Sequence, residues 1–143
     1  ECCQSTFRIW KIYSLYNWSA VMTEGICPSG WHIPSDGEFT DLTDFLGGAS
    51  VAGGKMKSTS GWNDGGNGSN SSGWSGLPGG YRYSGGFISD SGGFTSDGYF
   101  GFWWSASESI GTSWGRRLNY FDGDVYEYSS SRSNGLSARC VRD

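Results

Sequence analysis

Residues able to do acid–base or nucleophilic chemistry are sparse in this chain of 143 residues. His32 is its only histidine. No serine, aspartate or cysteine stands near His32 in a pattern that would make this histidine a catalytic base. We therefore expect His32 to be a structural hydrogen-bonding residue. Glu108 with Asp36 or Glu38 would supply the carboxylate pair of a glycoside hydrolase, but their spacing gives this no support. The sequence predicts a protein that is not an enzyme.

The cysteines are Cys2, Cys3, Cys27 and Cys140, and their spacing matches no zinc-binding pattern. Cys27 and Cys140 stand near the two ends of the chain's main body. A disulfide between them, which we predict, would stabilise the fold by about 4–5 kcal/mol through the entropy of loop closure. Two buried free thiols are the alternative. For the adjacent Cys2 and Cys3, a bond to another chain, a bond to each other and the free state all stay open.

Composition limits the class of protein. Charged residues make up 17% of the chain, while Trp, Tyr and Phe number 8 each, which is the reverse of a disordered chain. Basic residues are scattered apart from Arg116-Arg117, so no nucleic-acid partner is expected. No run of about 18 apolar residues predicts membrane insertion. The 25 glycines disfavour long helices, so we expect one α+β domain, rich in loops, with one or two short helices.

The clearest helix signal is a capping box. Ser35 is followed three residues later by Glu38, so each side chain can bond the backbone N–H of the other residue. Gly47-Gly48 is expected to end this helix. A second short helix is predicted around residues 51–58, although Gly53-Gly54 weaken it. The first helix should bury one apolar stripe formed by Phe39, Leu42, Phe45 and Leu46.

Apolar runs elsewhere predict strands. Residues 7–21 form a dense apolar run without clean periodicity, which we interpret as one or two buried strands. The C-terminal third predicts a small antiparallel sheet with Asp122-Gly123 as a hairpin turn. Its strands are expected at Phe100–Trp104, Ser113–Phe121, Val125–Tyr128 and Leu136–Val141.

Several stretches, in order along the chain, resemble the Fibrobacter succinogenes major paralogous domain. The first is Cys27-Pro-Ser-Gly-Trp-His-Ile-Pro-Ser-Asp36, followed by an acidic helix that ends at Leu46-Gly-Gly. The others are Ala52-Gly-Gly-Lys-Met-Lys-Ser-Thr-Ser-Gly-Trp62, Gly73-Trp-Ser-Gly-Leu-Pro-Gly-Gly-Tyr-Arg82, Trp103-Trp-Ser-Ala-Ser-Glu108 and Arg139-Cys-Val-Arg-Asp143. The resemblance covers one domain over residues 15–143 and leaves residues 1–14 as an N-terminal extension or strand.

That family is similar to the variable proteins of diversity-generating retroelements and, more distantly, to formylglycine-generating enzymes. The resemblance implies a C-type-lectin-like (formylglycine-generating-enzyme-like) fold in which N- and C-terminal strands are adjacent. It also implies a bacterial or phage origin and an extracellular or cell-surface location. The enzyme activity is not carried over, because it needs a paired reactive cysteine site, and Cys27 and Cys140 are explained by a disulfide.

In the variable proteins, ligand-facing residues precede the terminal Arg-Cys-Val-Arg, which here corresponds to residues 115–134. Side chains alternate along a strand, so Arg117, Asn119 and Phe121 should face outward if Leu118 and Tyr120 face the core. Trp114 and Val125 are placed in the core on the same grounds, and Gly115 faces out. Tyr supplies rigid contact area and Ser, Asn and Gly adapt, as in antibody paratopes. The predicted ligand-binding residues are Arg117, Asn119, Phe121, Asp122, Asp124, Tyr126, Tyr128, Arg132 and Asn134.

Two readings of this face compete: a binding surface, and an ordinary solvated face. The surface around Trp62–Trp74 is the next candidate for binding. Asn63, Asp64 and Asn67 offer oxygens suited to a structural Ca²⁺, but Asp64 is the only carboxylate among them. A turn stabilised by Asn and Asp side chains is the favoured explanation, so no cofactor is predicted and a structural Ca²⁺ is kept as the alternative.

The sequence therefore predicts a secreted or surface-displayed, non-catalytic module. It would recognise a protein or carbohydrate ligand on a cell surface through a Tyr/Ser/Arg-rich face near its C-terminus. The alternative is a structural, filament or adhesin subunit that self-associates on the bacterial surface.

Overall fold

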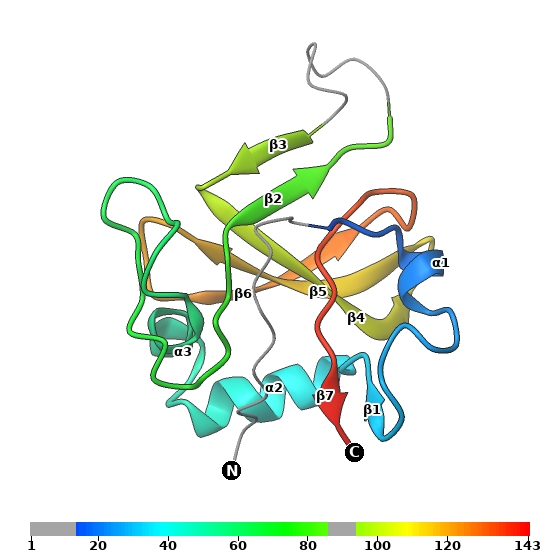
Figure 1. The fold of residues 1–143 in the computed structure, drawn as a ribbon, viewed down its shortest axis with the longest axis horizontal. Coiled ribbons are helices and arrows are strands. Elements are labelled where there is room, and N and C mark those ends of the chain that lie inside the picture. Colours follow the sequence, from blue (N-terminus) through cyan, green and yellow to red (C-terminus); the bar gives the residue numbers. More distant parts are fainter. Residues whose placement is uncertain (1–13, 86–93) are drawn as a thin grey trace.

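A computed structural model of the protein describes residues 14–85 and 94–143. Cys2, Cys3 and the first part of the predicted N-terminal strand lie outside the described residues. The described part has a curled five-stranded sheet with strand order β3-β2-β4-β5-β6, which Figure 1 shows above α2 and α3. Its strands are β2 Gly79–Arg82, β3 Phe94–Asp97, β4 Phe100–Ser109, β5 Thr112–Asn119 and β6 Val125–Ser130. The mixed α+β class expected from the sequence is confirmed.

Pairing within the sheet is antiparallel except between β2 and β4, which are parallel. The predicted central strand and the hairpin across Asp122-Gly123 are confirmed, since β4 lies between β2 and β5, and β5 pairs with β6. A second, two-stranded sheet joins β1 Trp31–His32 to β7 Val141–Arg142. The segments before β1 and β7 are linked by the disulfide Cys27–Cys140, as predicted. The two ends of the described domain are therefore fastened together.

The sheet has two different sides. Arg117 lies opposite Tyr126 and Phe102 in the ladder, so these three share the side that we call the aromatic face. Leu118 lies opposite Val125 on the other side, the core face. The main hydrophobic cluster covers the core face with residues of α2, α3 and the loops that follow: Phe39, Leu46, Ala52, Met56, Trp62, Trp74, Trp103, Leu118 and Val125. A second hydrophobic cluster covers one part of the aromatic face. It includes Trp18, Val21, Phe102, Trp104 and Leu136.

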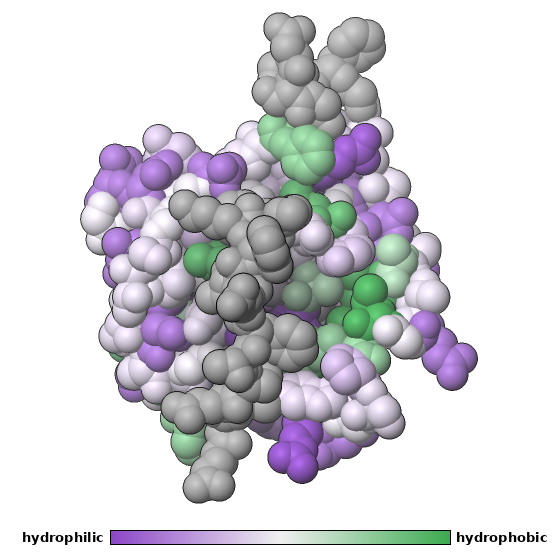
Figure 2. All heavy atoms as spheres, viewed as in Figure 1, coloured by the Kyte–Doolittle hydropathy of each residue, from purple (hydrophilic) through white to green (hydrophobic). Residues whose placement is uncertain are grey.

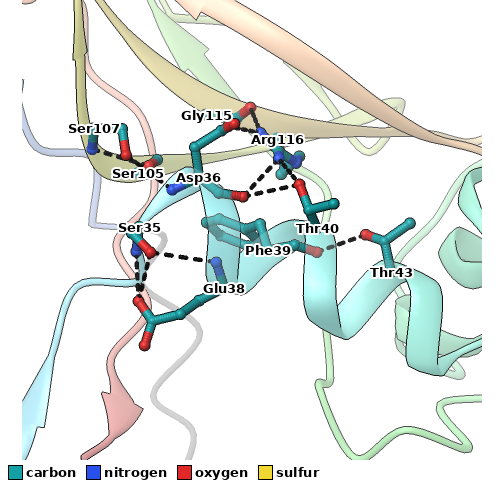
Figure 3. Close-up of polar contacts among 10 residues, drawn as sticks. All are labelled: Ser35, Asp36, Glu38, Phe39, Thr40, Thr43, Ser105, Ser107, Gly115 and Arg116. Carbon is teal, nitrogen blue, oxygen red and sulfur yellow. Dashed lines mark hydrogen bonds and ion pairs between the residues drawn. The ribbon is translucent and has the colours of Figure 1, made fainter.

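Helix α2, Asp36–Phe45, begins at the predicted cap. The Ser35 Oγ accepts from the Glu38 N–H, and the Glu38 carboxylate accepts from the Ser35 N–H at 2.8 Å (Figure 3). Gly47 and Gly48 follow with positive φ angles, as expected of a helix end. The confirmed capping box fixes where α2 starts under the sheet.

One residue of the predicted apolar stripe is wrong. Phe45 is 85% exposed, whereas Phe39 and Leu46 are buried. At about 3.6 residues per turn, Phe45 lies about 120° around the helix from Phe39. Thr43, which is nearer to Phe39 in angle, is buried in its place and donates its hydroxyl to the Phe39 carbonyl.

Helix α3, Ala49–Met56, begins two residues before the predicted range and contains both weakening glycines. Gly53 has a structural reason: a Cβ there would lie 2.4 Å from the Asp124 carbonyl oxygen. Glycine at this position lets α3 pack directly against the turn between β5 and β6. The helix thus supports the turn that carries several predicted ligand-binding residues.

Two predicted strands are wrong within the described residues. Trp18–Val21 forms a short helix, α1, whose first turn is capped by the Asn17 side chain. Only Tyr16 nearby shows strand character, through an isolated bridge to Leu136. The predicted last strand is likewise reduced to that bridge, a second bridge at Ser137, and β7. These segments pair with their neighbours through single bridges instead of forming full strands.

Candidate functional site

A cluster of aromatic rings extends across the aromatic face. Phe102 contacts Tyr81 and Tyr128, with ring centroids 5.1 and 4.9 Å apart. Phe100 continues the cluster toward the β5–β6 turn, where its ring contacts Tyr120 and Phe121. The rings are unequally covered: Phe102 is buried, Phe121 is 62% exposed, and Tyr81, Phe100, Tyr120, Tyr126 and Tyr128 are intermediate. The cluster is buried at Phe102 and becomes exposed to solvent at the β5–β6 turn.

Arg117 lies within this cluster. Its guanidinium Cζ is 4.6 Å from the centre of the Tyr126 ring and 6.0 Å from that of Phe100. Its Nε atom is buried without a hydrogen-bond partner. Among residues 14–85 and 94–143, no carboxylate forms an ion pair with Arg117. The face therefore presents a cation that is held by rings and not by an anion.

The β5–β6 turn is organised by the Asp122 carboxylate. One of its oxygens accepts from the Tyr126 hydroxyl at 2.8 Å and from the Asn119 side chain at 3.1 Å. Its other oxygen accepts from the Asp124 N–H at 3.1 Å. The hydrogen bond to Asp122 is the main cause that raises the pKa of the Tyr126 phenol, so this hydroxyl stays protonated at neutral pH. These contacts fix Asp122, Asp124 and Tyr126 relative to one another.

Lys57 also holds the β5–β6 turn in place. The sequence alone does not predict this role. Its ammonium donates to the carbonyl oxygens of Asn119 and Asp122 at 3.0 and 2.7 Å. Burial lowers the pKa of this amine. The two carbonyl groups belong to residues 62 and 65 positions after Lys57 in the chain. Every residue has a backbone carbonyl, so such acceptors leave no pattern in a sequence.

An open hollow of about 340 Å³ lies beside Lys57, between the glycine-rich loop after α3 and the β5–β6 turn. Its lining includes Gly66, where a Cβ would lie 2.3 Å from the Tyr120 carbonyl oxygen. The loop therefore packs tightly on the turn. The hollow borders the aromatic cluster at Tyr120 and Phe121.

The structure brings most of the predicted ligand-binding residues together. Arg117, Phe121, Asp122, Asp124, Tyr126 and Tyr128 lie on the aromatic face or its adjoining turn. The expectation that Asn119 faces solvent is wrong: it is 1% exposed, because its amide is turned under the turn toward Asp122. Asn134 is also buried, at 6%, where it accepts from the Ser84 N–H and donates to the Ser130 hydroxyl.

Arg132 lies away from this group. Its guanidinium pairs with Glu108 at 2.8 Å and stacks on Trp18, and its Nε donates to the Thr112 carbonyl. These contacts place it at the end of β5 that is opposite the β5–β6 turn. It fastens the β4–β5 hairpin.

Comparison with known proteins identifies the family. The chain matches the Fibrobacter succinogenes major domain over residues 4–142. It belongs to that family. The resemblance predicted from the motifs is confirmed, and the match takes in most of the first 14 residues. No curated protein and no solved structure matches the chain.

On the core face of this Fibrobacter succinogenes major domain, Arg116 is 2% exposed. Its guanidinium forms an ion pair with Asp36, bonds the Thr40 hydroxyl, and lies 5.3 Å from the centre of the Phe39 ring (Figure 3). Trp114, predicted to be in the core, is only half-buried. Arg116 occupies the covered position instead.

The second candidate surface is also corrected. Trp62 and Trp74 are buried, at the centre of the main hydrophobic cluster. The Trp62 indole N–H donates to the Gly76 carbonyl at 3.0 Å, and Trp74 packs on Phe39 and Trp103. These rings stabilise the domain and do not form a surface.

His32 is confirmed as a hydrogen-bonding residue. Its Nδ1 lies 2.6 Å from an Asp143 oxygen, and its Nε2 lies 2.7 Å from a Glu38 oxygen. The hydrogen bonds to Asp143 and then to Glu38 raise the pKa of the imidazole. The three carboxylates considered for hydrolysis are engaged separately: Glu38 with His32, Asp36 with Arg116, and Glu108 with Arg132.

The segment considered for calcium forms a hydrogen-bonded turn. The Asn67 side-chain oxygen accepts from the Trp62 N–H at 3.0 Å, and the Gly66 N–H donates to the Asn63 carbonyl. Asp64 is exposed with a φ of 50°. In the described ranges, no three His, Cys, Asp or Glu residues gather as metal ligands would. The same ranges hold no helix that is both long and apolar enough to cross a membrane.

Proposed function

We propose that this domain is a non-catalytic binding module with a C-type-lectin-like fold, which holds a protein or carbohydrate ligand of a cell surface on its aromatic face. The observation that carries the proposal is Arg117, a cation held between the rings of Phe100 and Tyr126 without an anionic partner in the described chain. Aromatic and arginine side chains dominate the energetics of binding interfaces. Here they occur together on one half-open surface.

The rigidity of the β5–β6 turn supports this proposal. The turn is held by hydrogen bonds to Lys57 and Asp122. It is also held by the close packing of Gly53 and Gly66 against its backbone. A surface that is ordered before binding loses little conformational entropy when its ligand arrives. A rigid turn of this kind can hold ligand-contacting side chains in fixed positions.

The extracellular location rests on the disulfide. Cys27–Cys140 fastens the domain, and structural disulfides persist mainly in oxidising compartments. The absence of catalysis is proposed because Glu38, Asp36 and Glu108 are each engaged by a different basic side chain, His32, Arg116 and Arg132.

A glycan and protein array tests the proposal. Wild type is compared with the triple variant Arg117→Ala/Tyr126→Ala/Tyr128→Ala, which should lose every specific signal while its melting temperature stays nearly unchanged. A matched triple variant, Phe45→Ala/Ile110→Ala/Arg142→Ala, changes exposed residues away from the face and should bind as wild type does. Retained binding by the first variant would mean that the ligand uses another surface.

Self-assembly is the second candidate function. Ile110 is fully exposed at the β4–β5 hairpin, and Phe94 is more than half exposed on the edge strand β3. Figure 2 shows hydrophobic area near β3 and beside α1 on an otherwise weakly polar side. Light scattering at several concentrations decides between the two functions, because a concentration-independent monomer contradicts self-assembly.

A further inference from the structure

The arginines around β5 differ in one respect. Arg116 is paired with Asp36, and Arg132 is paired with Glu108. Arg117 lies on β5 farther than Arg116 from the strand end that Arg132 contacts, and it makes ring contacts but no ion pair with any residue in the described ranges. Its Nε is buried and unsatisfied. The rest of the guanidinium is only partly covered and has no anion in the described ranges, so Arg117 can take an anionic partner from outside the domain.

The flanking rings determine what shape of partner fits. With Tyr126 at 4.6 Å and Phe100 at 6.0 Å from its Cζ, the guanidinium plane is held in place by two contacts. A planar, fixed guanidinium presents two parallel N–H donors, the geometry that matches a carboxylate. The favoured ligand group is therefore a carboxylate.

The surroundings of Arg117 favour a sugar over an acidic peptide. Asp122 and Asp124 both lie at the Tyr126 hydroxyl, so two carboxylates stand just beyond the ring that contacts Arg117. Their remaining lone pairs can accept from hydroxyl groups, which a sugar offers and an acidic side chain lacks. A uronate carries hydroxyl groups next to its carboxylate, and its apolar ring face can rest on exposed aromatic rings such as Phe121.

From this arrangement we infer that the aromatic face binds an acidic polysaccharide, with Arg117 holding a uronate carboxylate and Asp122 and Asp124 accepting from the neighbouring hydroxyls. The inference rests on the proposed binding function and names the ligand class for the same face. Arg117 selects the acidic form of the sugar, and the rings of the cluster bind it whether or not it is charged.

Polygalacturonate and its fully methyl-esterified form test the inference, since esterification removes the charge of each carboxyl group and adds only a methyl group. Binding is measured by affinity gel electrophoresis and calorimetry, with alginate and hyaluronan as further uronate polymers. Wild type should bind at least one uronate polymer, and for polygalacturonate esterification should weaken binding by about tenfold. Arg117→Gln should bind the acid and the ester equally, Arg117→Lys should keep only part of the preference, and Arg142→Gln, an exposed arginine in β7, should behave as wild type.

Several results would overturn the inference. These are no binding of wild type to any of the three uronate polymers, equal binding of polygalacturonate and its ester, or a preference that Arg117→Gln retains. Stronger binding of poly-glutamate than of the polysaccharides would assign the face to an acidic peptide. If the array yields a neutral glycan that the Arg117/Tyr126/Tyr128 variant loses, the binding function stands and this ligand class is wrong. Should Arg117→Gln fail to fold, the acid–ester comparison on wild type and Arg117→Lys decides.

Discussion

The two sides of β5 treat the same residue type in opposite ways. Arg116 points to the core face, where Asp36, Thr40 and the ring of Phe39 surround its guanidinium. Arg117, the next residue, points to the aromatic face, where it contacts the rings of Tyr126 and Phe100 and forms no ion pair within the described ranges. Successive side chains of a strand point to opposite faces of the sheet, so two neighbouring arginines are separated in this way. The core face supplies an anion to its arginine, and within the described residues the aromatic face does not.

That difference suggests how the domain separates stability from recognition. The core face is fastened by buried rings and by α2, whose start is fixed by the capping box. The aromatic face is fastened at its turn by Lys57 and Asp122, while its rings and cation stay partly open. Substitutions on the two faces should therefore change different measured quantities.

Leu118→Ala should produce the largest loss of stability. Leu118 is fully buried on the core face, so truncation should lower the free energy of unfolding by about 2–5 kcal/mol. Phe121→Ala, on the exposed side of the same hairpin, should change it by less than about 1 kcal/mol. Urea denaturation measures both. Equal losses would show that the faces do not differ in packing.

Arg116→Met should come next. Methionine keeps part of the packing on Phe39 but leaves Asp36 without its cation, so we expect a loss of about 2 kcal/mol. Asp36 is partly exposed and can regain water, which limits the loss. Arg117→Met serves as the matched control and should stay within about 0.5 kcal/mol. A larger effect at Arg117 than at Arg116 would reverse the comparison.

Ser35→Ala should lower stability by about 1 kcal/mol, because it removes the side-chain acceptor of the Glu38 N–H at the start of α2. The thermal midpoint should fall without any change in ligand binding, since α2 lies against the core face. A melting curve that matches wild type would mean that the cap contributes nothing.

The smallest effect should be a pH dependence from His32. Hydrogen bonds to Asp143 and Glu38 raise its pKa above the ordinary 6.5, so the folded state binds the proton more tightly than the unfolded state. The resulting stabilisation is complete below pH 6.5 and is lost as pH rises through the raised value. The stability difference between wild type and His32→Gln should thus shrink with rising pH. A difference that grows or stays constant would contradict the assignment.

Local signals predicted much of this structure. The capping box at Ser35, the hairpin at Asp122-Gly123 and the Cys27–Cys140 disulfide all depend on short patterns or residue types that the sequence displays directly. The face of β5 followed from alternation, which correctly placed Arg117 and Leu118 on opposite sides. Six of the residues predicted to bind a ligand lie together on the aromatic face or its turn, and their role in binding stays a prediction.

The misses arise from contacts that close over long sequence separations. Asn119 obeys alternation in its backbone, yet the turn draws its amide inward toward Asp122. Lys57 escaped notice because its acceptors are distant backbone carbonyls. The apolar run around Trp18 predicts a strand, although Asn17 supplies a helix cap. In each case the deciding contact is tertiary or rests on a single capping residue.

The most direct test of the account follows the Nε–H signals of Arg116 and Arg117 by NMR during titration with a ligand selected on the array. The account predicts that the Arg117 signal shifts strongly, because its guanidinium gains the partner that the described chain does not supply. The Arg116 signal should stay in place, since Asp36 and Thr40 already hold that side chain. Saturable binding that leaves the Arg117 signal unmoved would contradict the claim that the aromatic face is the ligand site.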